Sequence, residues 1–311
     1  MEIWRIHLKP DEHKGIESSR QFCIDRGIVG VGWPIDYTTT PVSWEEYEKA
    51  VYEKAATDEY YRKWRMAVGT IKNNMQNDDL VWTRDKKGRY FLGRVTGEWY
   101  YDTSNENAKV NIVNVRKCEW HEIGTVDKIP GRVVTNFVRG QTVRRIKSDT
   151  VRIFSQIMYN QKSNGDFLYK DKDIDDLSDK NIFDLLSPDD CEDALAIYLQ
   201  VLRGYYLIPS SCKKDTVHYE YALKNKKTGK LAFAQVKSGR NDSLNPDNFS
   251  ELAKPDIDVY LFATSGDYEE GTSKANIETI EPEKIRKFIY EHADILPDKI
   301  KVWVELTRPK S

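Results

Sequence analysis

The first half of the chain alternates between short apolar or aromatic runs and glycine-containing turns. Residues 79–84 and 90–97 are rich in β-branched and aromatic side chains and flank a Lys-Lys-Gly turn, which predicts a β-hairpin. Similar runs predict further strands at 27–33, 98–101, 110–116 and 118–123. Ser43 and Glu46 form a capping-box pattern that predicts the start of a helix. Many short strands at this spacing favour a small, mainly β barrel or a strongly curled sheet.

The second half of the chain changes between helical and β patterns. Ser187 and Pro188 begin a predicted helix, in which apolar residues recur at helical spacing until Gly204. Short apolar runs then predict strands at 205–208, 218–223, 231–237, 259–263 and 301–305, and further helices are expected at 248–253 and 282–293. This order of elements predicts an α/β domain with a central mixed sheet.

The boundary between the two halves is a polar, charge-dense run between residues 160 and 180. A chain of 311 residues fits two domains of ordinary size. We therefore expect a first domain at 1–155, a linker at 156–181 and a second domain at 182–311.

Composition excludes several classes of protein. Hydrophobic residues make up 39% of the chain and aromatic residues 12%, which argues against a disordered protein. No apolar run approaches the ~20 residues that span a bilayer, and the N-terminus lacks the apolar core of a signal peptide. The four cysteines lie far apart and without zinc-ligand spacing. We therefore expect a cytoplasmic protein with no membrane partner, no disulfide framework and no structural zinc.

The net charge is −2, from 48 basic and 50 acidic residues, so the total charge of the chain does not indicate a nucleic-acid partner. Charge is nevertheless concentrated locally, since residues 131–152 contain six Lys or Arg residues and one Asp. Arg144 and Arg145 lie in this segment and are candidates for binding phosphates. The alternative is a solvated strand face followed by an ordinary helix end.

Three residues of the second half, Glu220, Gln235 and Lys237, have the chemistry of a hydrolytic site. Residues i and i+2 of a strand face the same side, so Gln235 and Lys237 are expected to project together. Glu220 would lie near them if its strand pairs antiparallel across the turn at 224–229. An acid, an amide and an ammonium together are the parts of a Mg²⁺-dependent phosphodiester hydrolase. The alternative is the exposed face of an amphipathic strand.

The order of these features also resembles a known family. A helix, Gly204-Tyr205, an acid-bearing strand and then Gln235-Val236-Lys237 are similar to the PD-(D/E)XK nuclease superfamily, over residues 182–265. The Gln-x-Lys form is similar to Mrr-like restriction endonucleases. The resemblance implies a restriction-endonuclease-like α/β domain that cuts a phosphodiester backbone with Mg²⁺.

The resemblance also implies roles for particular residues. Glu220 and Gln235 would hold the metal, Lys237 would be the catalytic lysine, and Glu192 on the first helix would approach the metal. The acid-bearing strand reads Tyr-Glu-Tyr, where Mrr-like sequences commonly have an Asp among glycines, so Asp215 is an alternative ligand to Glu220.

The first half resembles small PUA-like and EVE-like barrels, through Gly-Val-Gly-Trp, Asp-Leu-Val-Trp-Thr-Arg and Leu-Gly-Arg-Val-Thr-Gly. The resemblance implies a domain that reads a modified or flipped base, with aromatics stacking on the base and arginines holding phosphates. Trp33 and Trp82 are the expected pocket residues. The other candidates for nucleic-acid binding are Arg84, Arg94, Trp99, Tyr101, Arg144 and Arg145. The alternative is that the aromatics fill the core of a β domain.

Together the two resemblances imply a Mg²⁺-dependent endonuclease that cuts DNA carrying modified bases, in type IV-like restriction for antiviral defence. Cutting both strands of a duplex favours a homodimer. Two alternatives use the same residues: a catalytically inactive nucleic-acid-binding protein with a nuclease-like scaffold, and an RNA-directed nuclease.

Overall fold

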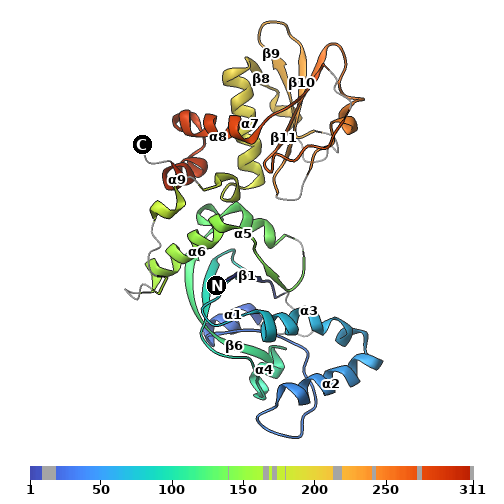
Figure 1. Ribbon diagram of the computed structural model, residues 1–311, viewed down its shortest axis with the longest axis vertical. Coiled ribbons are helices and arrows are strands. Elements are labelled where there is room, and N and C mark those ends of the chain that lie inside the picture. The colour runs from blue at the N-terminus through green and yellow to red at the C-terminus, as the bar shows by residue number, and fades with distance from the viewer. Residues whose placement is uncertain are drawn as a thin grey trace. The chain divides into compact units, whose positions relative to one another are not determined.

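The computed structural model describes residues 1–8, 19–138, 140–163, 168–169, 174–178, 180–212, 219–239, 243–271 and 275–308. The chain divides into two compact units, Met1–Asp176 and Leu177–Ser311 (Figure 1). No helix in the described ranges is long and apolar enough to cross a membrane.

The first unit contains a curled mixed sheet with the strand order β2-β6-β4-β3-β1-β7 and with β5 paired to β6. The strands are β1 (Ile3–Ile6), β2 (Ile28–Val31), β3 (Leu80–Arg84), β4 (Tyr90–Val95), β5 (Tyr100–Tyr101), β6 (Asn114–Gly124) and β7 (Val143–Arg145). β1 and β3 are parallel, and the other pairs are antiparallel. The predicted hairpin is confirmed as β3 and β4. The expectation of two strands at 110–116 and 118–123 is corrected: residues 110–113 are not in a strand, and 114–124 form one continuous strand, β6, which bends through the unit (Figure 1).

Helices occupy much more of this unit than a mainly β domain would allow, so that expectation is corrected to a mixed α/β unit. They are α1 (Ser19–Asp25), α2 (Trp44–Thr57), η2 (Glu59–Lys63), α3 (Trp64–Gly69), the π-helical η3 (Thr70–Asn74), α4 (Asn105–Lys109), η4 (Val126–Lys128), α5 (Gly131–Asn136) and α6 (Asp149–Lys162). η5 (Ile174–Leu177) lies at the division between the units. Ser43 caps α2 as predicted, with its side chain accepting a hydrogen bond from Glu46 N.

Helix α6 accounts for part of the helical content that the sequence pattern did not predict for this unit. Ser148 caps it, and Val151, Phe154 and Ile157 are buried at helical spacing. The Trp82 indole on β3 donates to Ser155 Oγ of this helix at 3.0 Å, which ties the helix to the sheet. Residues 156–162, which we expected in the linker, therefore complete a core helix of the first unit.

The second unit contains a sheet with the order β12-β11-β10-β9-β8. The strands are β8 (Tyr205–Leu207), β9 (Tyr221–Asn225), β10 (Leu231–Lys237), β11 (Ile257–Ala263) and β12 (Ile277–Thr279). β9 is antiparallel to both β8 and β10, and β10, β11 and β12 run parallel, so the sheet is mixed as predicted.

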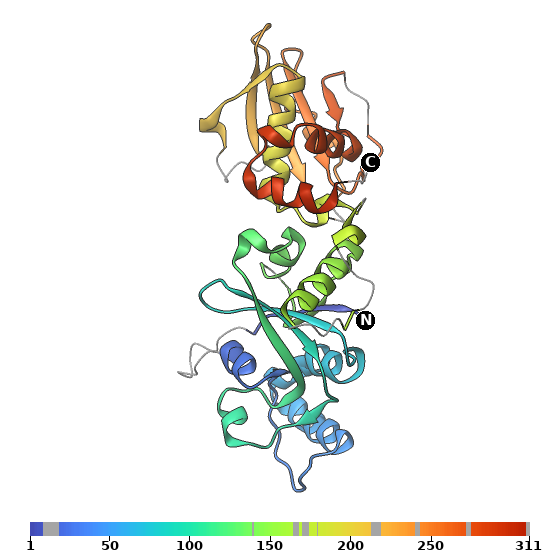
Figure 2. The same cartoon turned by 90° about the vertical axis from the view of Figure 1, so that its left-hand side faces the viewer.

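The helical elements of this unit are η6 (Ile182–Asp184), α7 (Pro188–Leu202), η7 (Pro209–Ser211), η8 (Pro246–Phe249), α8 (Pro282–Glu291), η9 (Ala293–Ile295) and α9 (Asp298–Thr307). Ser187 and Asp190 form a capping box that begins α7, which lies against the sheet (Figure 2). The helix expected at 248–253 is reduced to the short η8 and a turn.

The strand predicted at 301–305 is wrong, because these residues belong to α9. Ile300, Trp303, Val304 and Thr307 are buried at the i, i+3, i+4, i+7 spacing of a helix. Taken alone, the short apolar run Val-Trp-Val is typical of a strand. Ile300 before it and Thr307 after it complete the pattern of a helix.

Candidate functional site

Glu220 and Gln235 are in direct contact in the second unit. The Glu220 backbone N–H donates to the Ala234 carbonyl at 2.9 Å, which extends the β9–β10 ladder by one residue. The Gln235 amide Nε2 donates to Glu220 Oε1 at 2.6 Å and to the Val236 carbonyl at 3.3 Å. Gln235 is only 8% exposed, so the acid and the amide meet at a largely desolvated point of the sheet.

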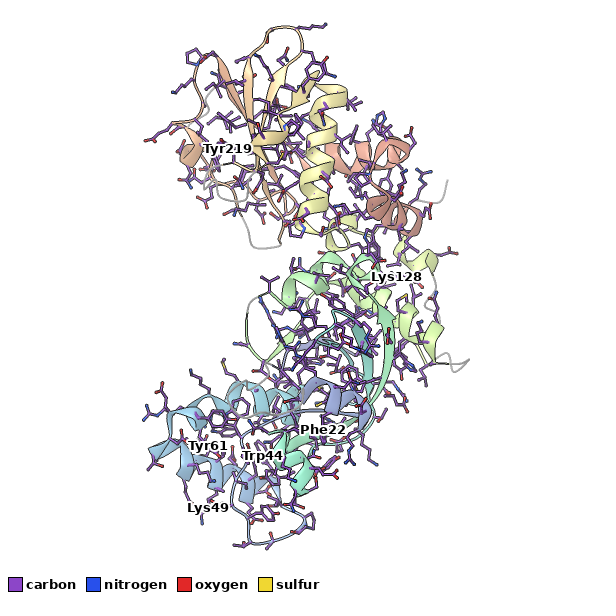
Figure 3. The ribbon with its side chains drawn as sticks, turned by 180° about the vertical axis from the view of Figure 1, so that it is seen from behind. Phe22, Trp44, Lys49, Tyr61, Lys128 and Tyr219 are labelled. Atoms are coloured by element: carbon purple, nitrogen blue, oxygen red, sulfur yellow. The ribbon has the colours of Figure 1, made fainter. Side chains whose placement is uncertain are left out.

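The residue before Glu220 helps to fix its position. The Tyr219 ring stacks on the Phe233 ring of β10, with ring centroids 4.4 Å apart and an interplanar angle of 29° (Figure 3). Stacked aromatic rings add to the backbone ladder in holding two strands in register. The Tyr219 ring before Glu220 and the β9–β10 ladder after it therefore both hold this segment against β10.

Lys237 is the last residue of β10 and is exposed. It stands two residues after Gln235, so the two side chains leave the strand on the same face. Ala234 and Val236, on the other face, are buried. Within the described ranges the structure records no hydrogen bond or ion pair of the Lys237 ammonium. Glu220, Gln235 and Lys237 therefore share one face of the sheet, where Lys237 is exposed.

Glu192 lies on α7 near the same place. The Tyr221 hydroxyl donates to the Glu192 carbonyl at 3.1 Å. Burial raises the pKa of Tyr221, and the nearby carboxylates of Glu192 and Glu220 raise it further. Both carboxylates are thus close enough to the same phenol to act on its charge.

The donors that a hard cation could use at this place are the Glu220 carboxylate and the Gln235 amide oxygen. Among the described residues, no three His, Cys, Asp or Glu side chains gather as a metal-ligand set. Asp215, the alternative ligand, lies outside the described residues.

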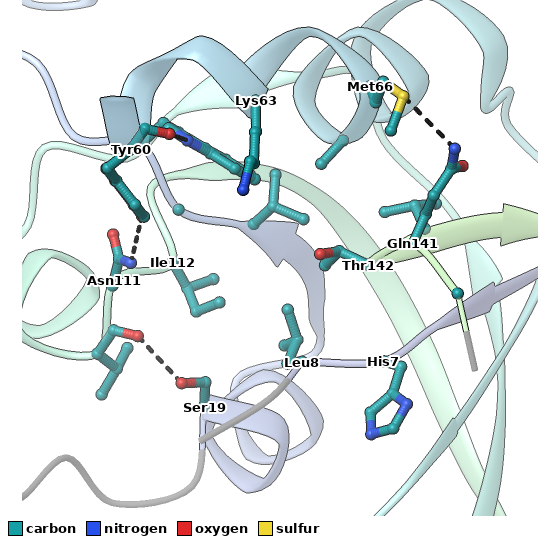
Figure 4. Close-up of a pocket in the computed structure, with 17 residues that line it drawn as sticks. His7, Leu8, Ser19, Tyr60, Lys63, Met66, Asn111, Ile112, Gln141 and Thr142 are labelled. Atoms are coloured by element: carbon teal, nitrogen blue, oxygen red, sulfur yellow. Dashed lines mark hydrogen bonds between the residues drawn. The ribbon is translucent and has the colours of Figure 1, made fainter. Parts of the chain in front are cut away.

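A cavity of about 610 Å³ opens in the first unit (Figure 4). Its wall includes Leu8 after β1, Val31 at the end of β2 and Val143 on β7, so the pocket lies where the ends of these strands come together. Residues of η2 and α3 and of the loop before β6 complete it. We call this cavity the Trp33 pocket.

Tyr60 is held in the wall of the Trp33 pocket by two neighbours. The Trp33 ring stacks on the Tyr60 ring, with centroids 5.7 Å apart and an angle of 21°, and the Trp33 indole donates to the Tyr60 carbonyl at 3.0 Å. The Asn111 amide donates to the Tyr60 hydroxyl at 2.8 Å (Figure 4). The pocket therefore has a preorganised aromatic wall.

The backbone of the pocket is strained at the residues that hold Tyr60. Trp33 has φ 66° and Asn111 has φ 55°, in the left-handed region that non-glycine residues rarely adopt. Gly32 lies between them in space, because a Cβ there would stand 2.6 Å from Asn111 Oδ1. Strain of this kind concentrates at ligand sites, so the backbone marks the pocket independently of any sequence resemblance.

The polar groups of the pocket favour a ligand that accepts hydrogen bonds. Lys63 projects into it, and of the described residues that line it none is Asp or Glu. Asn111 Oδ1 is buried and has no hydrogen-bond partner within the described ranges. Tyr60, Lys63 and Asn111 were missed by the sequence analysis. Only the tolerance of Asn for left-handed backbone hinted at Asn111.

Trp82 does not belong to the pocket, and that prediction is corrected. Its side chain is fully buried on β3, between β4 and β1 and beneath α6. Tyr101 is also in the core, at 7% exposure, where its hydroxyl accepts from Ile35 N at 3.0 Å. A base could stack on neither ring without unfolding the unit.

The remaining predicted residues of the first unit do not line the Trp33 pocket. Trp99 is half-buried and donates to Asn114 Oδ1 at 3.3 Å. Arg94 is held by ion pairs to Asp78 at 3.0 Å and Glu119 at 2.9 Å. The other three are Arg84, whose guanidinium lies 5.3 Å from the centre of the Phe137 ring, and the exposed Arg144 and Arg145.

Comparisons with known proteins add little to this geometry. The family model of a "Domain of unknown function (DUF8426)" matches residues 4–147, within the first unit. Among solved structures, the DNA modification-dependent restriction endonuclease AspBHI aligns with 91% of this chain and 80% of its own, at 10% identity and a TM-score of 0.24. A TM-score this low does not define a common fold. No curated protein matches the chain.

Proposed function

We propose that this protein binds nucleic acid through its first unit and hydrolyses a phosphodiester bond with its second. The observation that carries the proposal is the 2.6 Å contact between Gln235 Nε2 and Glu220 Oε1, on a face that Lys237 shares. An acid, an amide and an exposed ammonium on one face of the sheet support phosphodiester hydrolysis.

The donor set is compatible with Mg²⁺. The second oxygen of Glu220 and the amide oxygen of Gln235 are hard ligands, and together they carry one negative charge. When bound, Mg²⁺ supplies a water of lowered pKa and neutralises charge on the phosphate. The ammonium of Lys237 can then orient that water or stabilise the developing negative charge. Because the set has one carboxylate, we expect weak metal binding, and Glu192 is the residue that could add a second charge.

The Trp33 pocket supports a base-reading role for the first unit. Its volume of about 610 Å³ and its stacked aromatic wall suit a flat ring, and Lys63 suits an acceptor on that ring. The curled sheet around it is compatible with a PUA-like or EVE-like barrel. We infer a DNA endonuclease that depends on a base modification and acts as a homodimer in antiviral restriction.

A cleavage assay tests the second unit. Wild type is incubated with modified and plain DNA duplexes in Mg²⁺ and in excess EDTA, beside Lys237→Ala and Glu220→Gln. Lys224→Ala is the matched control, because Lys224 is an exposed lysine at the far end of the β9–β10 ladder. We expect cleavage in Mg²⁺ alone, a loss of about 10²–10³-fold in both site variants and wild-type rates in the control. Cleavage that persists in Lys237→Ala would refute the mechanism.

One observation favours a second candidate, a binding protein that has kept a nuclease-like scaffold without activity. Gln235 stands where the resemblance implies an acid, and its amide N–H is hydrogen-bonded to the remaining carboxylate, as in a structural pair. Tight binding without cleavage of any DNA or RNA would favour this candidate. Cleavage of RNA but not of matched DNA would assign the same residues to an RNA-directed nuclease.

A further inference from the structure

Two guanidinium groups lie side by side in the first unit, and no described carboxylate is paired with either of them. Arg5 on β1 is directly opposite Arg144 on β7 in the antiparallel register. Arg5 is fully buried, whereas Arg144 is exposed. The structure records no ion pair for either residue in the part of the chain that it describes. Like charges opposite each other on paired strands are destabilising, so this arrangement lowers the stability of the unit and calls for an explanation.

Arg5 is only partly hydrogen-bonded. Its Nη1 donates to the carbonyls of Gln141 and Thr142. Its Nε and Nη2 are buried and have no partner within the described ranges. Burial, with the neighbouring charge of Arg144, lowers the pKa of Arg5 to about 10. A buried charged donor without an acceptor is costly, whereas an anion placed at Nη2 would remove that cost.

The backbone of Gly140 comes close to both guanidinium groups. A Cβ on Gly140 would stand 3.2 Å from Arg5 Nη2 and 3.7 Å from Arg144 Nη1, so one atom at that position lies close to both guanidinium groups. Gly140 has φ 120° and lines the Trp33 pocket, as do Gln141 and Thr142. The two arginines therefore contact a segment that forms part of the pocket wall.

Among the described residues, a further cation lies beside the pair. The Phe137 ring lies 5.7 Å from the Arg5 guanidinium and 5.3 Å from that of Arg84, so a third cation stands on the same ring. Asp85, next to Arg84, is engaged by Arg89 at 2.7 Å.

We propose that Arg5 and Arg144 bind a phosphate group at Gly140, on the edge of the Trp33 pocket. A phosphate oxygen beside Gly140 accepts from Arg5 Nη2, and small rotations of the two side chains bring Arg144 Nη1 to a second oxygen. This inference rests on the proposed function, since the phosphate is that of the nucleotide whose base enters the pocket. The shared chemistry of a phosphodiester and of free phosphate makes the site testable without nucleic acid.

Thermal unfolding in phosphate tests the site directly. Wild type, Arg144→Ala and Arg145→Ala are compared in sodium phosphate and in sodium chloride of equal ionic strength. Arg145 is the matched control, because it is the next residue on β7, faces the opposite side of the sheet and is paired with Glu2. We expect phosphate at ten or more times its Kd to raise the Tm of wild type and Arg145→Ala by about 2–4 °C, and that of Arg144→Ala by less than half as much.

Arg5→Lys tests the buried partner. It keeps the positive charge but lacks Nη2, and its own unfolding in chloride gives its reference stability. We expect it to lose the phosphate response. An equal phosphate response in all variants would overturn the proposal, and a full response in Arg5→Lys would remove Arg5 from the site.

The salt dependence of binding to a single-stranded oligonucleotide separates this proposal from the proposed function. We expect the slope of log K against log salt to fall by about 0.7 in Arg144→Ala and to stay unchanged in Arg145→Ala. A phosphate response without oligonucleotide binding would keep the anion site and refute the reader role. Oligonucleotide binding with equal slopes and equal phosphate responses would keep the reader role and refute the site.

Discussion

Replacing Trp33 by alanine and, separately, by glycine distinguishes the role of its ring from the cost of its backbone. Both changes remove the stacked contact with Tyr60, worth about 0.5–1.5 kcal/mol, and the indole hydrogen bond to the Tyr60 carbonyl, worth about 0.5–1.5 kcal/mol. We therefore expect Trp33→Ala to lower the free energy of unfolding by about 1–3 kcal/mol.

The two variants differ in what they do to the backbone. At φ 66° a residue with a Cβ pays about 1–2 kcal/mol that glycine does not. Glycine loses about 0.5–1 kcal/mol more chain entropy on folding than alanine. At the midpoints of these ranges the difference leaves Trp33→Gly more stable than Trp33→Ala by about 0.75 kcal/mol, the reverse of the usual order of the two residues.

Urea unfolding followed by tryptophan fluorescence measures this difference in the full chain. Seven of the eight tryptophans lie in residues 1–176, so the signal reports mainly the first unit even after Trp33 is removed. The same variants are then titrated with an oligonucleotide, where we expect both to bind about 5- to 150-fold more weakly than wild type. An alanine variant as stable as the glycine variant would refute the strained backbone. Wild-type affinity in both would remove the ring from the binding site.

Two further predictions concern titratable groups. Cys212 is exposed, whereas Cys23, Cys118 and Cys191 are buried and burial raises the pKa of Cys23 to about 12. We expect one thiol per native chain to react rapidly with a disulfide reagent at about pH 8, and all four in denaturant; more than one fast thiol would contradict the burial. Burial lowers the pKa of His121 below its usual 6.5, so the unfolded chain takes up the proton first and stability falls as the pH falls below about 6.5. We expect His121→Gln to lack that loss, and an unchanged pH profile would contradict it.

The Glu220–Gln235 contact could be predicted from the sequence because local features determine it. The turn at 224–229 joins two β patterns, and a short connection leaves little choice of register between them. The alternation of residues along β10 then places Gln235 and Lys237 on one face. Each step uses residues that are close together in the sequence.

Trp33 and Trp82 could not be told apart in the same way. Both are tryptophans in short β patterns of similar composition. Their difference arises from distant segments: β1, β4 and α6 enclose Trp82, while Tyr60 and Asn111 hold Trp33 at a cavity. Alternation within a strand says which residues share a face, and the packing of other elements decides whether that face is buried.

The net charge of −2 does not indicate whether the first unit can bind an anion, for a physical reason. In physiological salt a charge acts over a Debye length of about 8 Å, so an anion responds to the groups around it and not to the sum over the chain. At the Trp33 pocket those groups are Lys63 in the wall and Arg5 and Arg144 beside Gly140, with no Asp or Glu among the described lining residues. Arg5 and Arg144 are 139 residues apart in the sequence and become neighbours only through the pairing of β1 with β7. A chain that is acidic overall can therefore present a cationic pocket, and the pairing of its strands determines where.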